Sequence, residues 1–267
     1  MINPEVFKEL QNRSIITQVG LSPDMFNDIT ELQNLGLVTD TYSDEVYDLI
    51  VNEINNKVNY TNTFLESIAT GGKIILENDI ILSSPIIIEK NVELDLNGYT
   101  ITNIPWDEDG ELNSYVFWVK NGKLTINGTG NVISPSSVYS MAVWANGGDV
   151  EINGGEYKNG GDSCDLIYVS KKGTITINNG KFIASGPASG LAPGTKNPYS
   201  ALNIKDKDKL NCKINVKGGN FYKFNPADNL SENPKMNFVA TGYESVKEGD
   251  WFIVKELKEI IVDDGNE

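Results

Sequence analysis

The sequence predicts a mainly β protein: a right-handed, single-stranded parallel β-helix with a small N-terminal α-helical domain, assembled as a trimer. Two observations carry this prediction. The phrase DVEINGGEYKNGG at 149–161 returns in similar form at 123–132, 174–183 and 213–222, and such recurrence is typical of a repeat architecture. The apolar period also changes at Gly71, from helical spacing before it to strand-like alternation after it.

The residues before the repeats are expected to form a helical attachment and trimerisation domain over 1–62. One helix is predicted to begin at Ser22-Pro23-Asp24, which combines an N-cap residue, a proline and an acidic first turn. A second is predicted from Ser43 or Asp44. Its apolar stripe recurs every four residues and consists of Val46, Ile50, Ile54 and Val58. Flanked by further apolar residues, this stripe is wide for a helix alone in water, so we expect it to bundle or to dock.

The segment 63–235 is expected to be the β-helix, preceded by a cap helix at about 61–69. Three strand positions recur in each repeat. The inward-facing pairs of the first strand are Leu94/Leu96, Leu124/Ile126, Val150/Ile152, Ile175/Ile177 and Ile214/Val216. The second strand follows with Ile101, Val132, Tyr157, Phe182 and Phe221, and the third comprises YVFWV (115–119), MAVWA (141–145), LIYVS (166–170) and ALNIK (201–205). Asn-Gly corners between strands supply the positive φ that tight turns need, and 105–114 and 184–198 are interpreted as inserted loops.

The third strand of each repeat is apolar on both faces. If Phe117, Val119 and their equivalents face inward, the outward column is Val116, Trp118, Ala142, Trp144, Leu166 and Tyr168, continued by Ala201 and Asn203. A lone soluble domain seldom exposes such a patch. Three explanations compete: the 184–198 loop covers the face, the indoles form a platform for carbohydrate, or copies of the chain bury it. We favour the third, because rotational symmetry lets long flat faces meet.

Composition limits the partners. The chain of 267 residues has 37 acidic against 22 basic side chains and a net charge of −15, which repels nucleic acid and anionic membrane surfaces. We find no signal peptide and no membrane span, so we expect a soluble protein made in a cytoplasm. Two cysteines, Cys164 and Cys212, are too few for a zinc site or a disulfide framework. Both lie at strand starts and are expected to be small buried side chains.

Catalysis is not expected, although parallel β-helices often host polysaccharide lyases and hydrolases. The chain has no histidine, which excludes a Ser-His or Cys-His nucleophile system, and Arg13, its one arginine, precedes the β-helix. Hydrolysis would need two carboxylates at a defined separation. The candidates are Asp162 with Asp165, and the group Asp107, Glu108, Asp109 and Glu111. Neither set lies on the rigid outward face of a strand, and we expect no cofactor and no metal.

Three longer runs resemble one class of viral protein. GGKIILENDIILSSPIIIEKNVELDLNGYTIT (71–102) resembles the entry coils of β-helices in bacteriophage fibres and in surface proteins of gut Bacteroidetes. GGNFYKFNPADNLSENPKMNFVATGYESVKEGDWFIV (218–254) is similar to the ending of phage β-helices. Together with LVTDTYSDEVYDLIVNEINNK (37–57), most of the chain resembles the head fibre proteins of crAss-like bacteriophages. LDLNG and GGxF recur across unrelated β-helix proteins, so these motifs specify the fold better than the role.

The resemblance implies a homotrimer on the capsid exterior, attached to the capsid or a capsid auxiliary protein through the N-terminal helices, with no catalytic residues to carry over. It also implies a C-terminal cap over 236–267, in which Gly242-Tyr243 and the Glu248-Gly249-Asp250 turn belong to a hairpin before an acidic tail. An uncovered last rung would be a sheet edge that polymerises.

We therefore expect a structural virion protein, made in the bacterial host cytoplasm, for which adhesion to host or mucosal glycans is a hypothesis. The alternative is a tail-associated polysaccharide depolymerase. That enzyme would carry a carboxylate pair or a calcium site in a groove. A bacterial cell-surface module is a third interpretation, weakened by the missing export signal.

Overall fold

The computed structural model describes Lys8 and residues 44–108, 111–134, 139–159, 165–184, 200–228 and 236–258, without the side chains of 44–51, 53–55, 106–112 and 139. The chain is mainly β, and its strands form parallel sheets. It divides into two compact units, residues 1–62 and 63–267. The predicted helix start at Ser22 lies outside the described residues.

Helix α3 (Asp44–Thr70) begins where the second helix was predicted. The prediction of a separate cap helix at about 61–69 was wrong, because α3 runs through that segment without a break. No Gly or Pro interrupts residues 44–70, and the helix ends where Gly71 turns with φ 82°. Phe64 and Ile68, one turn apart near its C-terminus, are buried, which supports the expected cap of the first rung.

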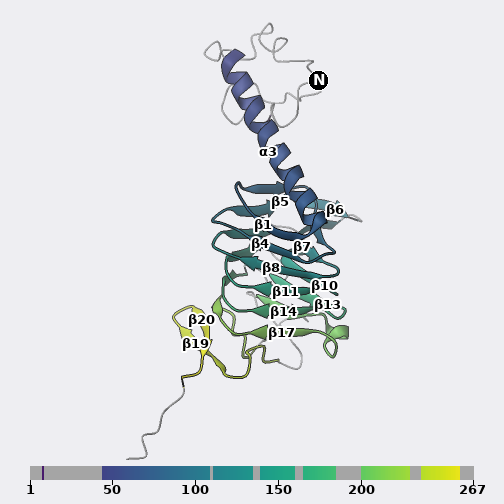
Figure 1. The fold of residues 1–267 in the computed structure, drawn as a ribbon. Coiled ribbons are helices and arrows are strands. Elements are labelled where there is room, and N and C mark those ends of the chain that lie inside the picture. The colour runs from purple at the N-terminus through teal and green to yellow at the C-terminus, as the bar shows by residue number, and fades with distance from the viewer. Residues whose placement is uncertain are drawn as a thin grey trace, which may run out of the picture. The chain divides into compact units, whose positions relative to one another are not determined.

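The unit of residues 63–267 is built from three sheets, and successive strands of the chain belong to each of them in turn (Figure 1). The first sheet contains β1 (Gly72–Ile75), β4 (Val92–Asp95), β8 (Lys123–Asn127), β11 (Asp149–Ile152), β14 (Thr174–Ile177) and β17 (Lys213–Val216). The second contains β2 (Ile80–Leu82), β5 (Thr100–Asn103), β9 (Asn131–Ser134), β12 (Glu156–Asn159), β15 (Lys181–Ile183) and β18 (Gly219–Tyr222). The third contains β3 (Ile86–Ile88), β7 (Glu111–Val119), β10 (Tyr139–Asn146), β13 (Ile167–Ser170) and β16 (Leu202–Ile204). We call three consecutive strands, one from each sheet, a rung.

The core lies between the sheets and consists of like residues stacked rung upon rung. The predicted second-strand series is confirmed: Ile101, Val132, Tyr157, Phe182 and Phe221 pair in register and are fully buried. Ring centroids of Tyr157 and Phe182 lie 5.1 Å apart and those of Phe182 and Phe221 4.7 Å apart, both pairs stacked. In the third sheet, the predicted inward residues from Phe117 and Val119 to Ile204 are buried as well.

The pairing in the first sheet differs from one predicted alignment. Val92 pairs with Leu124 and Leu94 with Ile126, so the predicted alignment of Leu94 with Leu124 was shifted by two residues. The cause is the turn between the first and second sheets. The number of residues in this turn, counted between paired positions of the two sheets, falls along the chain. The turn comprises 95–99 in one rung, 127–130 in the next, and only 153–155, 178–180 and 217–219 in the later rungs.

A β-hairpin replaces one predicted loop. β6 (Trp106–Glu108) pairs antiparallel with the start of β7, so 106–108 and 111–113 extend the third sheet. The second predicted loop, 184–198, lies outside the described residues except for Ala184. A short 3-10 helix, η2 (Asp206–Asp208), follows β16.

The predicted C-terminal hairpin is confirmed. β19 (Tyr243–Glu248) and β20 (Trp251–Glu256) pair antiparallel, and β20 pairs antiparallel with β18 at the end of the second sheet. An isolated bridge from Val216 to Val239 extends the first sheet in the same region. The outer strand β19 carries Glu244, Lys247 and Glu248, and charged side chains on an edge strand discourage pairing with another chain. The acidic tail from 259 onward lies outside the described residues.

Cys212 lies just before β17, as predicted, but it is only half-buried. Its thiol donates to the backbone carbonyl of Lys171, with Sγ and O 3.2 Å apart. Burial, followed by the nearby Asp208 carboxylate, raises the pKa of the thiol, which disfavours the reactive thiolate. Cys164 lies outside the described residues.

Candidate functional site

The outer face of the third sheet carries the aromatic ladder, which we define as Trp118, Trp144 and Tyr168. These residues pair in register from β7 to β10 to β13. The two indoles stack with centroids 5.0 Å apart, and the Tyr168 ring lies 6.3 Å from Trp144. All three are half-buried, and Ile87, in register with Trp118, is 41% exposed. The structure therefore brings the predicted aromatic residues together on one open face.

Neighbouring side chains hold the ladder in place. Trp144 Nε1 donates to Ser170 Oγ at 2.9 Å, and that hydroxyl donates to Asn146 Oδ1 at 2.9 Å. The Tyr115 ring packs edge-on against Trp144 at 5.3 Å. Lys120 Nζ lies 4.0 Å from the Trp118 ring centroid, a cation–π geometry. The ladder is thus a preorganised aromatic surface.

The other half of the predicted outward column was wrong. Val116, Ala142 and Leu166 are 0% exposed in the single chain, as is Ala201. The N–H groups of both Ala142 and Val143 donate to the Leu166 carbonyl, at 2.9 and 3.3 Å. Two successive donors converging on one acceptor mark a break in strict alternation, as at a β-bulge. Residues on both sides of this break point inward, so this column belongs to the core.

A polar cluster lies buried behind this break and accounts for one catalytic candidate. Asp165 is 2% exposed and accepts hydrogen bonds from Ser200 Oγ at 2.6 Å and Asn203 Nδ2 at 2.8 Å. Ser114, Ser134 and Ser140 form a further buried chain of hydroxyls. The Asp165 carboxylate therefore pairs with buried polar side chains and is closed off from substrate. Asp162 and Asp109 lie outside the described residues, as do the side chains of Asp107, Glu108 and Glu111.

The N-terminal stripe can be placed only in part. The backbone of Val46, Ile50 and Ile54 is helical within α3, but their side chains lie outside the described residues. Val58 is 48% exposed.

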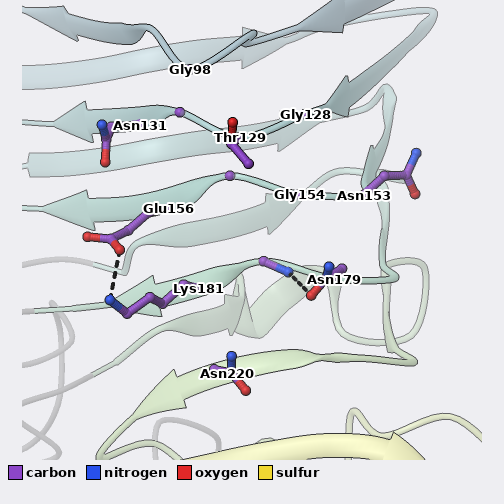
Figure 2. A pocket seen from close by; sticks show the side chains of 13 residues that line it. Gly98, Gly128, Thr129, Asn131, Asn153, Gly154, Glu156, Asn179, Lys181 and Asn220 are labelled. Carbon is purple, nitrogen blue, oxygen red and sulfur yellow. Dashed lines mark hydrogen bonds and ion pairs between the residues drawn. The ribbon is translucent and has the colours of Figure 1, made fainter.

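The sequence reasoning missed a groove along the corner between the first and second sheets (Figure 2). It has a volume of about 650 Å³. Its lining comprises Gly98, Gly128, Thr129, Gly130, Asn131, Asn153, Gly154, Gly155, Glu156, Asn179, Gly180, Lys181 and Asn220. The signal in the sequence is the repeated Asn-Gly phrase, which turn chemistry alone also explains.

Rung stacking accounts for the glycine floor of this groove. A Cβ added to Gly154 would lie 2.3 Å from the Gly128 carbonyl oxygen, and one added to Gly218 would lie 2.2 Å from that of Asn178. Successive turns are therefore in backbone contact, and the floor is glycine for packing reasons. Any argument for a ligand has to come from the side chains on the walls.

An asparagine ladder supports one wall. Asn153 Nδ2 donates to Asn127 Oδ1 at 2.8 Å, and Asn178 Nδ2 donates to Asn153 Oδ1 at 2.7 Å. Asn178 also donates to Glu151 Oε1 at 3.0 Å. The hydrogen bond from Lys123 to Glu151 is the main reason why the pKa of that carboxyl is lowered, against the effect of burial.

The other wall carries a charge cluster. Glu156 forms ion pairs with Lys158 and with Lys181, the latter with N and O 2.8 Å apart. Burial alone would raise the pKa of Glu156, but the hydrogen bonds and charges of the two lysines outweigh it and lower the pKa. At neutral pH the groove therefore holds a carboxylate whose charge is compensated locally.

No group of three or more His, Cys, Asp or Glu residues suited to a metal ion occurs among the described residues. No helix in the described ranges is long and apolar enough to cross a membrane. In the comparisons with known proteins, no family model, no curated protein and no solved structure matches the chain.

Proposed function

We propose that the protein is a structural virion protein, a head fibre that adheres to glycans, and that its rungs form a right-handed, single-stranded parallel β-helix. The observation that carries the proposal is the continuous in-register pairing of successive rungs. Parallel pairs link β1 through β17 in the first sheet, and equivalent series link the second and third. A stack of this kind is rigid, as a fibre must be, and the resemblance of the sequence to phage head fibres supplies the setting.

Three copies meet, in this proposal, along the aromatic ladder of the third sheet. Its stacked indoles present a half-exposed apolar surface, of the kind that marks protein interfaces. The exposed Val58 supplies a second apolar contact in the N-terminal unit. Because Val116, Ala142 and Leu166 are already buried, the seam is narrower than the sequence predicted, and it depends on the aromatic rings.

The solution mass tests this proposal first. Light scattering on the full-length protein should give three times the chain mass of 29.3 kDa, unchanged on dilution. A monomer would contradict the trimeric fibre. Capsid attachment is tested with residues 63–267 alone, which should stay folded and trimeric but should not bind purified capsids.

A β-helical polysaccharide depolymerase is the weaker alternative. Neither the sequence candidate Asp165 nor the groove carboxylate Glu156 suits the role of its general acid. Asp165 is enclosed in the core, and Glu156 is kept ionised by Lys158 and Lys181, whereas a general acid must be protonated near its working pH. Release of reducing ends from a polysaccharide panel would favour the enzyme and overturn the structural assignment.

A further inference from the structure

We propose that the groove between the first and second sheets, extended by Trp251 of the C-terminal hairpin, binds a linear neutral glycan. This inference assigns a binding site to the glycan adhesion in the proposed function, and it rests on that proposal. It places the glycan away from the aromatic ladder, on different sheets.

The groove continues towards the hairpin. A second hollow of about 250 Å³ is lined by Lys181, Asn220, Glu248, Trp251 and Ile253, and it shares Lys181 and Asn220 with the groove. Tyr222 packs against Trp251 with ring centroids 5.2 Å apart, and Lys181 Nζ lies 5.3 Å from the Trp251 centroid. The indole is thus fixed yet half-exposed. A fixed indole offers a broad apolar face with a polar edge, which suits the apolar face of a sugar ring.

The walls offer hydrogen-bonding groups that the described part of the chain does not use. Within the described ranges, the Thr129 hydroxyl and the Asn220 amide have no side-chain hydrogen bond. Asn179 uses Oδ1 to accept from Gly180 N at 2.8 Å, which leaves its NH₂ group. Asn131 donates to Thr100 Oγ1 at 3.2 Å, which leaves its carbonyl oxygen. Amides and hydroxyls both donate and accept, as the hydroxyls of a sugar do.

The spacing of these groups suits a polymer. Asn131, Glu156, Lys181 and Asn220 occupy the same register position on successive strands of the second sheet. Figure 2 shows them following one another along one side of the groove, with Thr129, Asn153 and Asn179 on the other. Neighbouring strands lie about 4.7–4.9 Å apart, a step close to the length of one sugar unit. A glycan running along the stack therefore meets an equivalent polar position at each unit.

The charges around the groove indicate which class of glycan it binds. Glu156 is paired with Lys158 and Lys181, and Glu248 adds a further negative charge to the hollow, so no excess of positive charge faces the groove. The chain carries −15 overall, which repels polyanions. A neutral polysaccharide fits these walls better than a polyuronate or a nucleic acid strand.

The test is affinity electrophoresis of the full-length protein in native gels that contain dextran, barley β-glucan, xylan or glucomannan, with polygalacturonate as the polyanion. We expect at least one neutral polymer to retard the protein, and polygalacturonate not to. Trp251→Ala should weaken the binding about tenfold or more, and Trp251→Phe should restore part of it. Asn220→Ala should also weaken binding, and it leaves the side chains of the hairpin unchanged, although the backbone of Asn220 pairs with Ile253 of β20.

The matched control is Tyr243→Ala, which removes a half-buried aromatic ring from the same hairpin outside the groove; it should bind as the wild type does. The inference is overturned if no neutral polymer retards the wild type, or if Trp251→Ala and Asn220→Ala both bind normally. It is also overturned if Trp118→Ala abolishes binding while Trp251→Ala does not. A monomeric mass in light scattering would refute the trimeric fibre and leave these gel outcomes valid.

Discussion

The indoles of Trp118 and Trp144 lie parallel, with an interplanar angle of 2°, although they come from different rungs. Backbone register brings them together, because the two residues pair directly between β7 and β10, and neighbouring side chains hold the rings in place. The alignment joins two side chains into one aromatic surface, and Tyr168 on the next rung continues it with its ring tilted by 49° to that of Trp144. The interface proposed for the trimer depends on this surface.

Replacing both indoles by glutamate should dissociate the trimer. In Trp118→Glu with Trp144→Glu, adjacent carboxylates would have to enter a desolvated seam, which costs several kcal/mol per unpaired ion. We expect light scattering to give the mass of one chain, with an unchanged far-UV circular dichroism spectrum. The control is Ile133→Glu with Ile183→Glu on the second sheet, where both new carboxylates lie beside Lys158, and this variant should stay trimeric. A double indole variant that remains trimeric would place the seam elsewhere.

The contact between successive turns predicts a large effect of a single methyl group. Gly154→Ala should cost about 3 kcal/mol or more, since its Cβ would lie 2.3 Å from the Gly128 carbonyl oxygen. In Gly98→Ala, by contrast, the Cβ meets nothing within 4 Å, and only φ +86° is unfavourable. That variant should lose about 1–2 kcal/mol. Guanidinium unfolding measures both, and equal losses would argue against tight stacking of the turns.

Acid should destabilise the folded chain through Glu151 and Glu156. Both have a pKa lowered from the ordinary 4.5, so near that pH the unfolded chain binds more protons than the folded one, and stability rises with pH. The contribution is fully present above about pH 4.5 and is lost as pH falls through the folded values. We expect the unfolding midpoint to drop in this window, and to drop less in Glu151→Gln with Glu156→Gln. An identical drop in the double variant would exclude these two groups as the cause.

Removing the C-terminal hairpin should cause aggregation. A chain ending at Ala240 lacks β19 and β20 and exposes the edge of β18, which normally pairs with β20. Exposed edge strands pair with other chains. Size-exclusion chromatography should therefore show high-mass species for this truncation, while a chain ending at Lys258 behaves like the full-length protein. A monodisperse Ala240 truncation would mean that the hairpin does not protect the sheet.

Alternation along the strands predicted the core well, because a buried face leaves a period of two in the sequence. It placed Tyr157, Phe182 and Phe221 correctly. It failed at Val116 and Ala142, where a backbone break turns neighbouring side chains to the same side and leaves no mark in the hydrophobic pattern. It also misaligned Leu94, because the length of a turn depends on stacking against the next rung.

The candidate site was predicted in part. The aromatic ladder follows from strand register, so a sequence reader can find it. The groove does not, because it exists only where the glycine-containing turns of successive rungs lie over one another and where the C-terminal hairpin adds Trp251. Such a hollow is a property of the stack and of no single repeat.

The shortening of the turn between the first and second sheets has a consequence for the length of the stack, which we call its reach. From 153–155 onward, each rung turns this corner with the same number of residues, so a later rung fits between its neighbours without a change at either end of the stack. Duplicating or deleting the segment from Asp149 to Gly173 would change the reach in one step of about 4.8 Å. Length in this design is a discrete, modular variable that can be altered independently of both ends.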